Sequence, residues 1–200
     1  MCKVIAILCL CLFSSPQDTQ SSQTSDRKAS GQKALWQSDD NFKNMAEEVS
    51  ASGNVTDRDL LARHTKIVQA SDRQMRTKFE AAGFNDKAIY EIELMSWKDL
   101  AVTDKYFTAD SFQNYAQTHY GVLRVESKPT GANVWVNNSD WGTTTQEKGV
   151  MVGKKHIRLH LDRYQDSEGD VEVTPVKITI FAGILTKLKH AGNPGDIHDK

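Results

Sequence analysis

Gly121-Val-Leu-Arg-Val-Glu-Ser-Lys-Pro-Thr-Gly-Ala-Asn-Val-Trp-Val-Asn-Asn138 is the stretch that decides the fold of this chain. Apolar and polar residues alternate over residues 123–126 and again over residues 132–137, which is typical of strands with one buried face. Residues 128–131 contain a proline and a glycine, which tight turns favour. The stretch therefore predicts a strand, a turn and a second strand.

The same alternation returns twice further along the chain. The residues expected to share a buried face are Ile157, Leu159 and Leu161 in one strand, and Val176, Ile178 and Ile180 in another. A turn is predicted at residues 181–183, before a last strand over residues 184–188. Short strands separated by turn signals predict a small antiparallel β-sandwich over residues 120–190.

Three short motifs lie within this region. They are Ser127-Lys-Pro-Thr-Gly-Ala132, Gly142-Thr-Thr144 and Gly153-Lys-Lys-His156. Together they resemble the PEGA domain family, with two departures: Thr130 replaces the glutamate of the name-giving turn, and the proline that usually follows Gly-x-Thr is missing. The resemblance covers about a third of the chain. It implies a small β-rich module, usually outside the cytoplasm and often attached to other domains, with no catalytic activity.

The composition excludes several functional classes. The 200 residues allow one or two small domains, and the net charge of −1 without clustered Lys and Arg argues against nucleic-acid binding. All three cysteines, Cys2, Cys9 and Cys11, lie in the first eleven residues. If that segment is removed, the mature chain has no thiol for a nucleophile, a disulfide or a metal site.

The first residues have the layout of an export signal. One lysine precedes an apolar run over residues 4–13, and small residues follow. Residues 1–20 are therefore predicted to be a signal peptide, and the protein to be extracytoplasmic: periplasmic, secreted or on the cell surface. The apolar run is too short for a permanent transmembrane span. A lipid anchor on Cys9 or Cys11 is a less favoured alternative, because no small residue precedes either cysteine in the way that lipidation usually requires.

A helical part is predicted before the sandwich. Residues 21–55 are expected to form a polar linker with a short helix over residues 34–49, and residues 56–119 a helical subdomain. Its first helix is expected to have a capping box at Thr56 and to end at Gly83. A second helix follows Asn85-Asp86, and a third covers residues 109–119. The fold class is therefore α+β, and residues 191–200 are predicted to be a flexible tail.

The sequence contains no convincing catalytic, cofactor or metal motif. His156 and His160 share a strand face with Arg158, but a zinc site needs at least one more ligand, and no third candidate is evident. That face is therefore expected to be an exposed polar surface. The carboxylates of the helical part are expected to cap helices or face solvent; they belong to Asp57, Asp59, Asp99, Asp104 and Asp110.

Two tryptophans are the favoured binding residues. Trp135 lies opposite the Val134/Val136 face and is predicted to point outward, and Trp141 follows the turn that begins at Asn137. An exposed aromatic ring can stack on a sugar or on a partner's side chains. The alternative is that the helical part packs over both rings. Trp135, Trp141 and Asn137 are the predicted ligand-binding or partner-binding residues.

These observations favour an exported, non-enzymatic protein of the cell envelope or surface. Its PEGA-like module would bind an envelope protein or a polysaccharide, without a cofactor. Two other hypotheses stay open. One is an envelope hydrolase with its site in the helical part, and the other is a purely structural spacer.

Overall fold

The computed structural model of the protein describes residues 39–102 and 107–189. The predicted signal peptide, the lipid anchor, Asp104 and the C-terminal tail lie outside these described residues. Within the described ranges, no helix has both the length and the apolar character needed to cross a bilayer.

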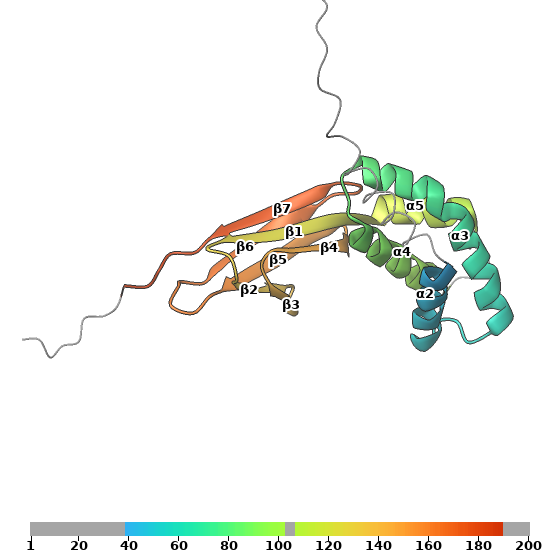
Figure 1. Ribbon diagram of the computed structural model, residues 1–200, viewed down its shortest axis with the longest axis horizontal. Coiled ribbons are helices and arrows are strands. Elements are labelled where there is room, and N and C mark those ends of the chain that lie inside the picture. Colours follow the sequence, from blue (N-terminus) through green and yellow to red (C-terminus); the bar gives the residue numbers. More distant parts are fainter. Residues whose placement is uncertain (1–38, 103–106, 190–200) are drawn as a thin grey trace, which may run out of the picture. The chain divides into compact units, whose positions relative to one another are not determined.

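The first half of the described chain is helical (Figure 1). Its helices are α2 (Asp39–Ala51), α3 (Arg58–Ala81), α4 (Asp86–Leu100) and α5 (Ala109–His119). The helices predicted after Asn85-Asp86 and over residues 109–119 are confirmed. Gly83 follows α3 with φ +85°, as expected for a residue that ends a helix.

The predicted cap of α3 is wrong by one residue. Asp57, not Thr56, is the N-cap, and its carboxylate accepts hydrogen bonds from the N–H groups of Asp59 and Leu60 at 2.8 and 3.2 Å. Both residues are good caps by type, so composition alone does not distinguish them. The geometry decides, because the Asp57 side chain reaches the free N–H groups of the first turn.

The helices share one apolar core. Its buried side chains come from all four of them and include Phe42, Met45, Val68, Phe79, Ile89, Trp97 and Phe112. Helix α2 lies in the segment predicted to be a polar linker with a short helix over residues 34–49, and its residues pack as part of the helical core. Burial of these large apolar groups is the main stabilising term for the helical part.

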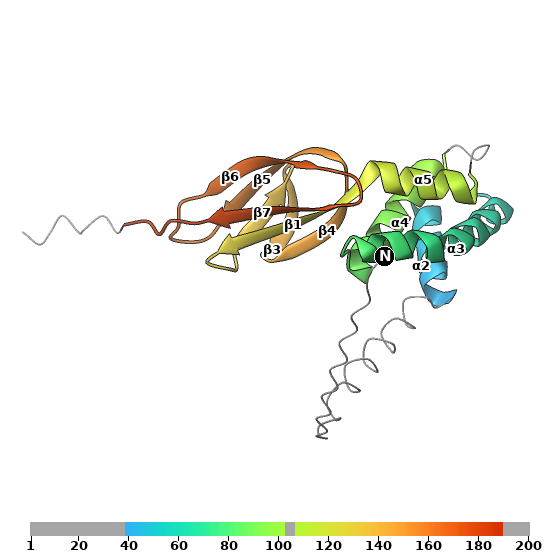
Figure 2. The ribbon, with the colours of Figure 1, turned by 90° about the horizontal axis from the view of Figure 1, so that it is seen from above.

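The second half of the described chain forms two sheets (Figure 2). Its strands are β1 (Tyr120–Lys128), β2 (Asn133–Val136), β3 (Ser139–Thr143), β4 (Gln146–Met151), β5 (Gly153–His160), β6 (Ser167–Val173) and β7 (Ile178–Ile184). One sheet has the order β4-β1-β7 and the other the order β3-β2-β5-β6. The predicted α+β class is confirmed.

The sandwich core contains the side chains expected from the alternation in the first strands. Leu123, Val125, Val134, Ile157 and Leu159 are fully buried together. The polar residues between them lie on the outer faces of the sheets. The sequence pattern therefore identified the buried face of β1, β2 and β5 correctly.

The end of the sandwich departs from the prediction. β7 pairs with β1 in parallel, and it runs through the turn predicted at residues 181–183. The chain crosses from one sheet to the other between β6 and β7, so β7 returns beside β1 in the same direction. The strand needs glycine at position 183 because a Cβ there would lie 2.3 Å from Cδ1 of Leu159. As a result Ile180 points to solvent, whereas Phe181 packs against the sandwich core.

Helix α4 packs on β4, at one end of the three-stranded sheet. A Cβ on Gly149 would lie 2.7 Å from the carbonyl oxygen of Ala88 and 2.7 Å from Cγ1 of Ile92. The Gly149 N–H donates a hydrogen bond to Oε2 of Glu91 at 2.9 Å. The absence of a side chain at this position lets the helix backbone approach the strand directly.

Candidate functional site

The predicted binding residue Trp135 lies on the outer face of the four-stranded sheet. Its neighbours Val134 and Val136 fill the sandwich core, so alternation turns the indole to the other side. Trp135 is opposite Arg158 of β5, and Arg158 is opposite Glu168 of β6. The ring therefore belongs to a row of residues that crosses three strands.

Arg158 stacks on the Trp135 ring. The guanidinium carbon lies 4.7 Å from the ring centroid, a distance at which a cation is attracted to the face of an indole. The contact leaves Trp135 half-buried. It also holds the long arginine side chain flat on the sheet, so that the ring and the guanidinium form a single surface.

Two columns of opposite charge extend this surface along β5 and β6. The basic column contains Lys154, His156, Arg158 and His160, and the acidic column contains Asp166, Glu168, Asp170 and Glu172. Lys154 pairs with Asp170 at 2.8 Å, and Nδ1 of His156 also lies 2.8 Å from an oxygen of Asp170. The exposed histidine face of β5 is therefore paired with the acidic side chains of β6, a neighbour that the sequence of β5 does not reveal.

The ion pairs shift the titration of several exposed groups. The hydrogen bond from the His160 ring to the Asp166 carboxylate raises the pKa of His160 above its ordinary value of 6.5. Hydrogen bonds from Lys154 and His156 lower the pKa of Asp170. The four acids of this surface outnumber its two permanent cations, Lys154 and Arg158.

Trp141 lies elsewhere. It is the extra residue of a bulge between β2 and β3, where Val134 pairs with Gly142 and Trp135 pairs with Asp140. Its ring packs against the sandwich core, and Nζ of Lys148 lies 5.0 Å from its centroid. Trp135 and Trp141 therefore do not form one surface, and neither ring belongs to the helical core that was the alternative expectation.

Asn137 forms part of the turn after β2, with φ +48°. Its Oδ1 accepts a hydrogen bond from the His156 N–H at 2.9 Å, and its own N–H donates to the His156 carbonyl at 2.8 Å. These bonds fix the turn beside β5. Asn137 remains exposed, two residues after Trp135 and beside His156 rather than in the row that contains Trp135.

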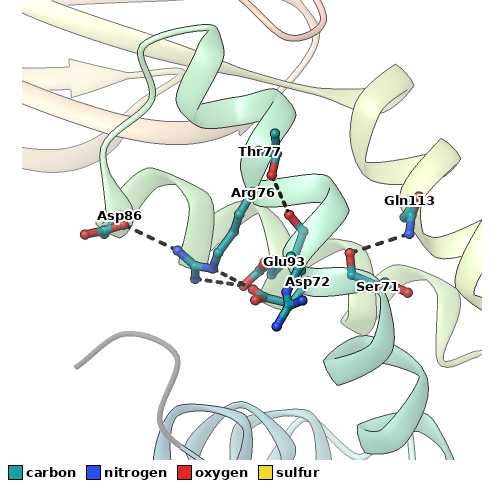
Figure 3. A network of polar contacts seen from close by, with 8 residues as sticks. Ser71, Asp72, Arg76, Thr77, Asp86, Glu93 and Gln113 are labelled. Carbon is teal, nitrogen blue, oxygen red and sulfur yellow. Dashed lines mark hydrogen bonds and ion pairs between the residues drawn. The ribbon is translucent and has the colours of Figure 1, made fainter. Parts of the chain in front are cut away.

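The helical part contains a buried charged network that the sequence analysis did not identify (Figure 3). Nε of Arg76 lies 2.5 Å from Oδ1 of Asp72, and its two terminal nitrogens lie 3.3 Å from Glu93 and 3.4 Å from Asp86. The Glu93 side chain is 0% exposed, and burial raises the pKa of its carboxyl well above the ordinary value. The i, i+4 spacing of Asp72 and Arg76 was the available signal, whereas Glu93 lies on an apolar face and gave none.

The carboxylates named from the sequence lie at helix starts or accept hydrogen bonds from other side chains. Asp57 caps α3, and Asp59 and Asp110 lie in the first turns of α3 and α5. Asp99 accepts hydrogen bonds from the hydroxyls of Tyr115 and Tyr120 at 3.1 and 2.5 Å. Across residues 39–102 and 107–189, no three His, Cys, Asp or Glu side chains come together in a way that could hold a metal ion.

The motifs around the first turn of the sandwich join in space. The Ser127 hydroxyl donates to the Pro129 carbonyl at 2.6 Å and lies 2.6 Å from Oγ1 of Thr144. Oγ1 of Thr144 also accepts from the Gly131 N–H at 3.0 Å. Ser-x-Pro-x-Gly-Ala and Gly-x-Thr thus form one hydrogen-bonded unit that links β1 to the end of β3.

Comparison with known proteins agrees with this geometry. No curated protein matches the chain with significant similarity. The model of the PEGA domain family matches residues 120–187, which begin at the first residue of β1 and include all seven strands. The helices α2 to α5 lie before the matched region. The C-terminal, two-sheet part of this protein is therefore a PEGA domain.

Proposed function

We propose that this protein is an exported, non-enzymatic interaction protein, and that the outer face of its four-stranded sheet binds a polysaccharide. The observation that carries the proposal is the Trp135 ring, which lies on an open sheet face with Arg158 stacked on it. Flat aromatic rings bind the apolar face of sugars, and neighbouring polar groups bind the hydroxyls. Asn133 and Asn137 are exposed on the same strand and its turn and supply such groups.

The charge of the surface favours an uncharged polymer. The acidic column of β6 lies directly beside the basic column of β5, and its carboxylates pair with β5 side chains; the four of them outnumber Lys154 and Arg158. A polyanion would be attracted to the β5 cations but repelled by four neighbouring carboxylates. A neutral polysaccharide avoids this repulsion.

The buried network of α3 and α4 supports a non-enzymatic role for the helices. The side chains of Arg76, Asp72 and Glu93 are 5%, 8% and 0% exposed, so a substrate would have no access to them. General acid–base chemistry requires contact between the carboxyl group and the substrate. The network is better suited to fixing α3 against α4.

The test is binding of the full chain to insoluble neutral polysaccharides and to isolated envelope fractions, measured by cosedimentation. Trp135→Ala should abolish binding, and Trp135→Phe should retain part of it because a flat ring remains. Glu172→Gln, at the far end of the same face, is the matched control and should bind as the wild type does. Equal binding by Trp135→Ala and the wild type would refute the proposal, provided that circular dichroism shows both to be folded.

A further inference from the structure

Strand β7 has an open edge. The Lys177 carbonyl accepts from the Val122 N–H at 3.0 Å, and the Leu185 N–H donates to the Lys128 carbonyl at 2.9 Å. The odd-numbered residues of β7 therefore direct their backbone groups to β1, and the even-numbered residues direct theirs the other way. Within the described part of the chain, no backbone partner faces Ile180, Ala182 or Ile184 on that side.

The same residues expose apolar side chains. Ile180 is 53% and Ile184 is 77% exposed, and both lie on the outer face of the three-stranded sheet. β7 contains no charged residue and no proline, which are the usual means of protecting a strand edge from pairing. Free backbone donors and acceptors beside exposed apolar side chains at alternate positions, here Ile180, Ala182 and Ile184, are the features by which a sheet takes up an additional strand.

We propose that the edge of β7 over residues 180–184 binds an extended peptide segment of a partner protein by adding it as a fourth strand to the sheet. The charges at the edge define this segment further. Lys177 is exposed at one end of the edge. At the other end the edge is closed, because residues 186 and 188 already bond to residues 165 and 163. The matching peptide is therefore short, with apolar side chains at alternate positions and an acidic residue at the end beside Lys177.

A second copy of the chain fits this edge poorly. In an antiparallel pair of β7 strands centred on Ala182, Lys177 of one copy would lie opposite Lys187 of the other. Residue 178 would lie opposite Thr186, whose carbonyl already accepts from the Gln165 N–H at 2.9 Å. Like charges and an occupied acceptor oppose the symmetric arrangement, whereas a short peptide avoids both.

This surface is on the sheet that does not contain Trp135, so the inference is independent of polysaccharide binding. Its first test is amide hydrogen exchange, measured by NMR on the full chain. The amides of Ile180, Ala182 and Ile184 should exchange fast, and those of Phe181 and Gly183 slowly. Adding a peptide of roughly six residues, with alternating valine and threonine and a glutamate at one end, should protect the three fast amides selectively.

Matched variants and peptides complete the test. The double variant Ile180→Thr, Ile184→Thr should bind the peptide roughly tenfold more weakly, because each substitution removes apolar surface that would contact the peptide side chains. Met151→Thr is the control, since Met151 is also exposed, at 45%, but lies on β4 at the other edge of the sheet. A peptide N-methylated at alternate residues should not bind. Protection of the three amides without peptide, dimers by ultracentrifugation, or no protection at millimolar peptide would each overturn the proposal.

Discussion

Replacement of Gly149 by alanine should separate α4 from the sheet. The added Cβ would lie 2.7 Å from the Ala88 carbonyl oxygen and from Cγ1 of Ile92, and 3.3 Å from the Ile92 nitrogen. Ordinary contacts begin near 3.4 Å, so the gap between helix and strand must open by 0.7 Å. Two of the three contacted atoms belong to the helix backbone, which cannot rotate away as a side chain can.

The expected loss in the free energy of unfolding has two parts. Overpacking of a closed interface costs about 1–3 kcal/mol. The shift also stretches the hydrogen bond from the Gly149 N–H to Glu91, worth about 1–2 kcal/mol with a charged acceptor. Together these lower the free energy of unfolding by about 2–5 kcal/mol, which for a chain of this size lowers Tm by roughly 4–20 °C.

The assay is thermal and urea unfolding followed by circular dichroism. Met151→Ala is the control, because Met151 is two residues away on the same strand and exposed. It should change the free energy of unfolding by less than about 1 kcal/mol. A Tm of Gly149→Ala within about 2 °C of the wild type would show that α4 does not lie against β4 in solution as described.

Four further predictions concern polar groups. Removing Arg76 as Arg76→Met leaves the buried carboxyl of Glu93 without its ion pair and should lower the free energy of unfolding by about 3–5 kcal/mol in urea titrations. Since burial raises the pKa of Glu93, its stabilising protonation is present below pH 4.5 and is lost as pH rises through the raised pKa. Glu93→Gln should therefore gain stability relative to the wild type as pH rises, and a constant difference across pH would contradict this. Because Asp166 raises the pKa of His160, the pair stabilises the fold below pH 6.5 and loses this effect as pH rises through the raised value; in NMR titrations Asp166→Asn should return that pKa toward 6.5. Ser127→Ala removes two hydrogen bonds of the first turn of the sandwich and should cost about 1–3 kcal/mol by thermal unfolding, whereas Ser127→Thr, which keeps a hydroxyl, should cost less.

Periodicity predicted what depends on the neighbours of a residue along the chain. The helix over residues 109–119 and the buried faces of β1 and β2 follow directly from the spacing of apolar side chains. The outward position of Trp135 follows from the same alternation. These properties are local, so one sequence was enough to find them.

The remaining features depend on contacts between distant segments. Glycine is a typical turn residue, but Gly183 lies inside β7. Glycine is needed there because a Cβ would lie 2.3 Å from Cδ1 of Leu159 in the other sheet. Trp141 was predicted to be a binding residue, but it is the extra residue of a bulge and its ring packs against the sandwich core. Glu93 occupies an apolar helix position, and only the fold brings it to Arg76 of another helix. None of these pairings has a signal within a short window of sequence.

Strand β1 has a mechanical consequence for the protein. α5 ends at His119 and β1 begins at Tyr120, so no linker separates the helices from the sandwich. Tyr120 and Val122 are buried in the helical core, whereas Leu123 and Val125 are buried in the sandwich core. The first residue of the PEGA domain is therefore no hinge. A load carried by a partner at the β7 edge would pass through β1, as shear along one continuous strand, directly into the packed interior of the helices.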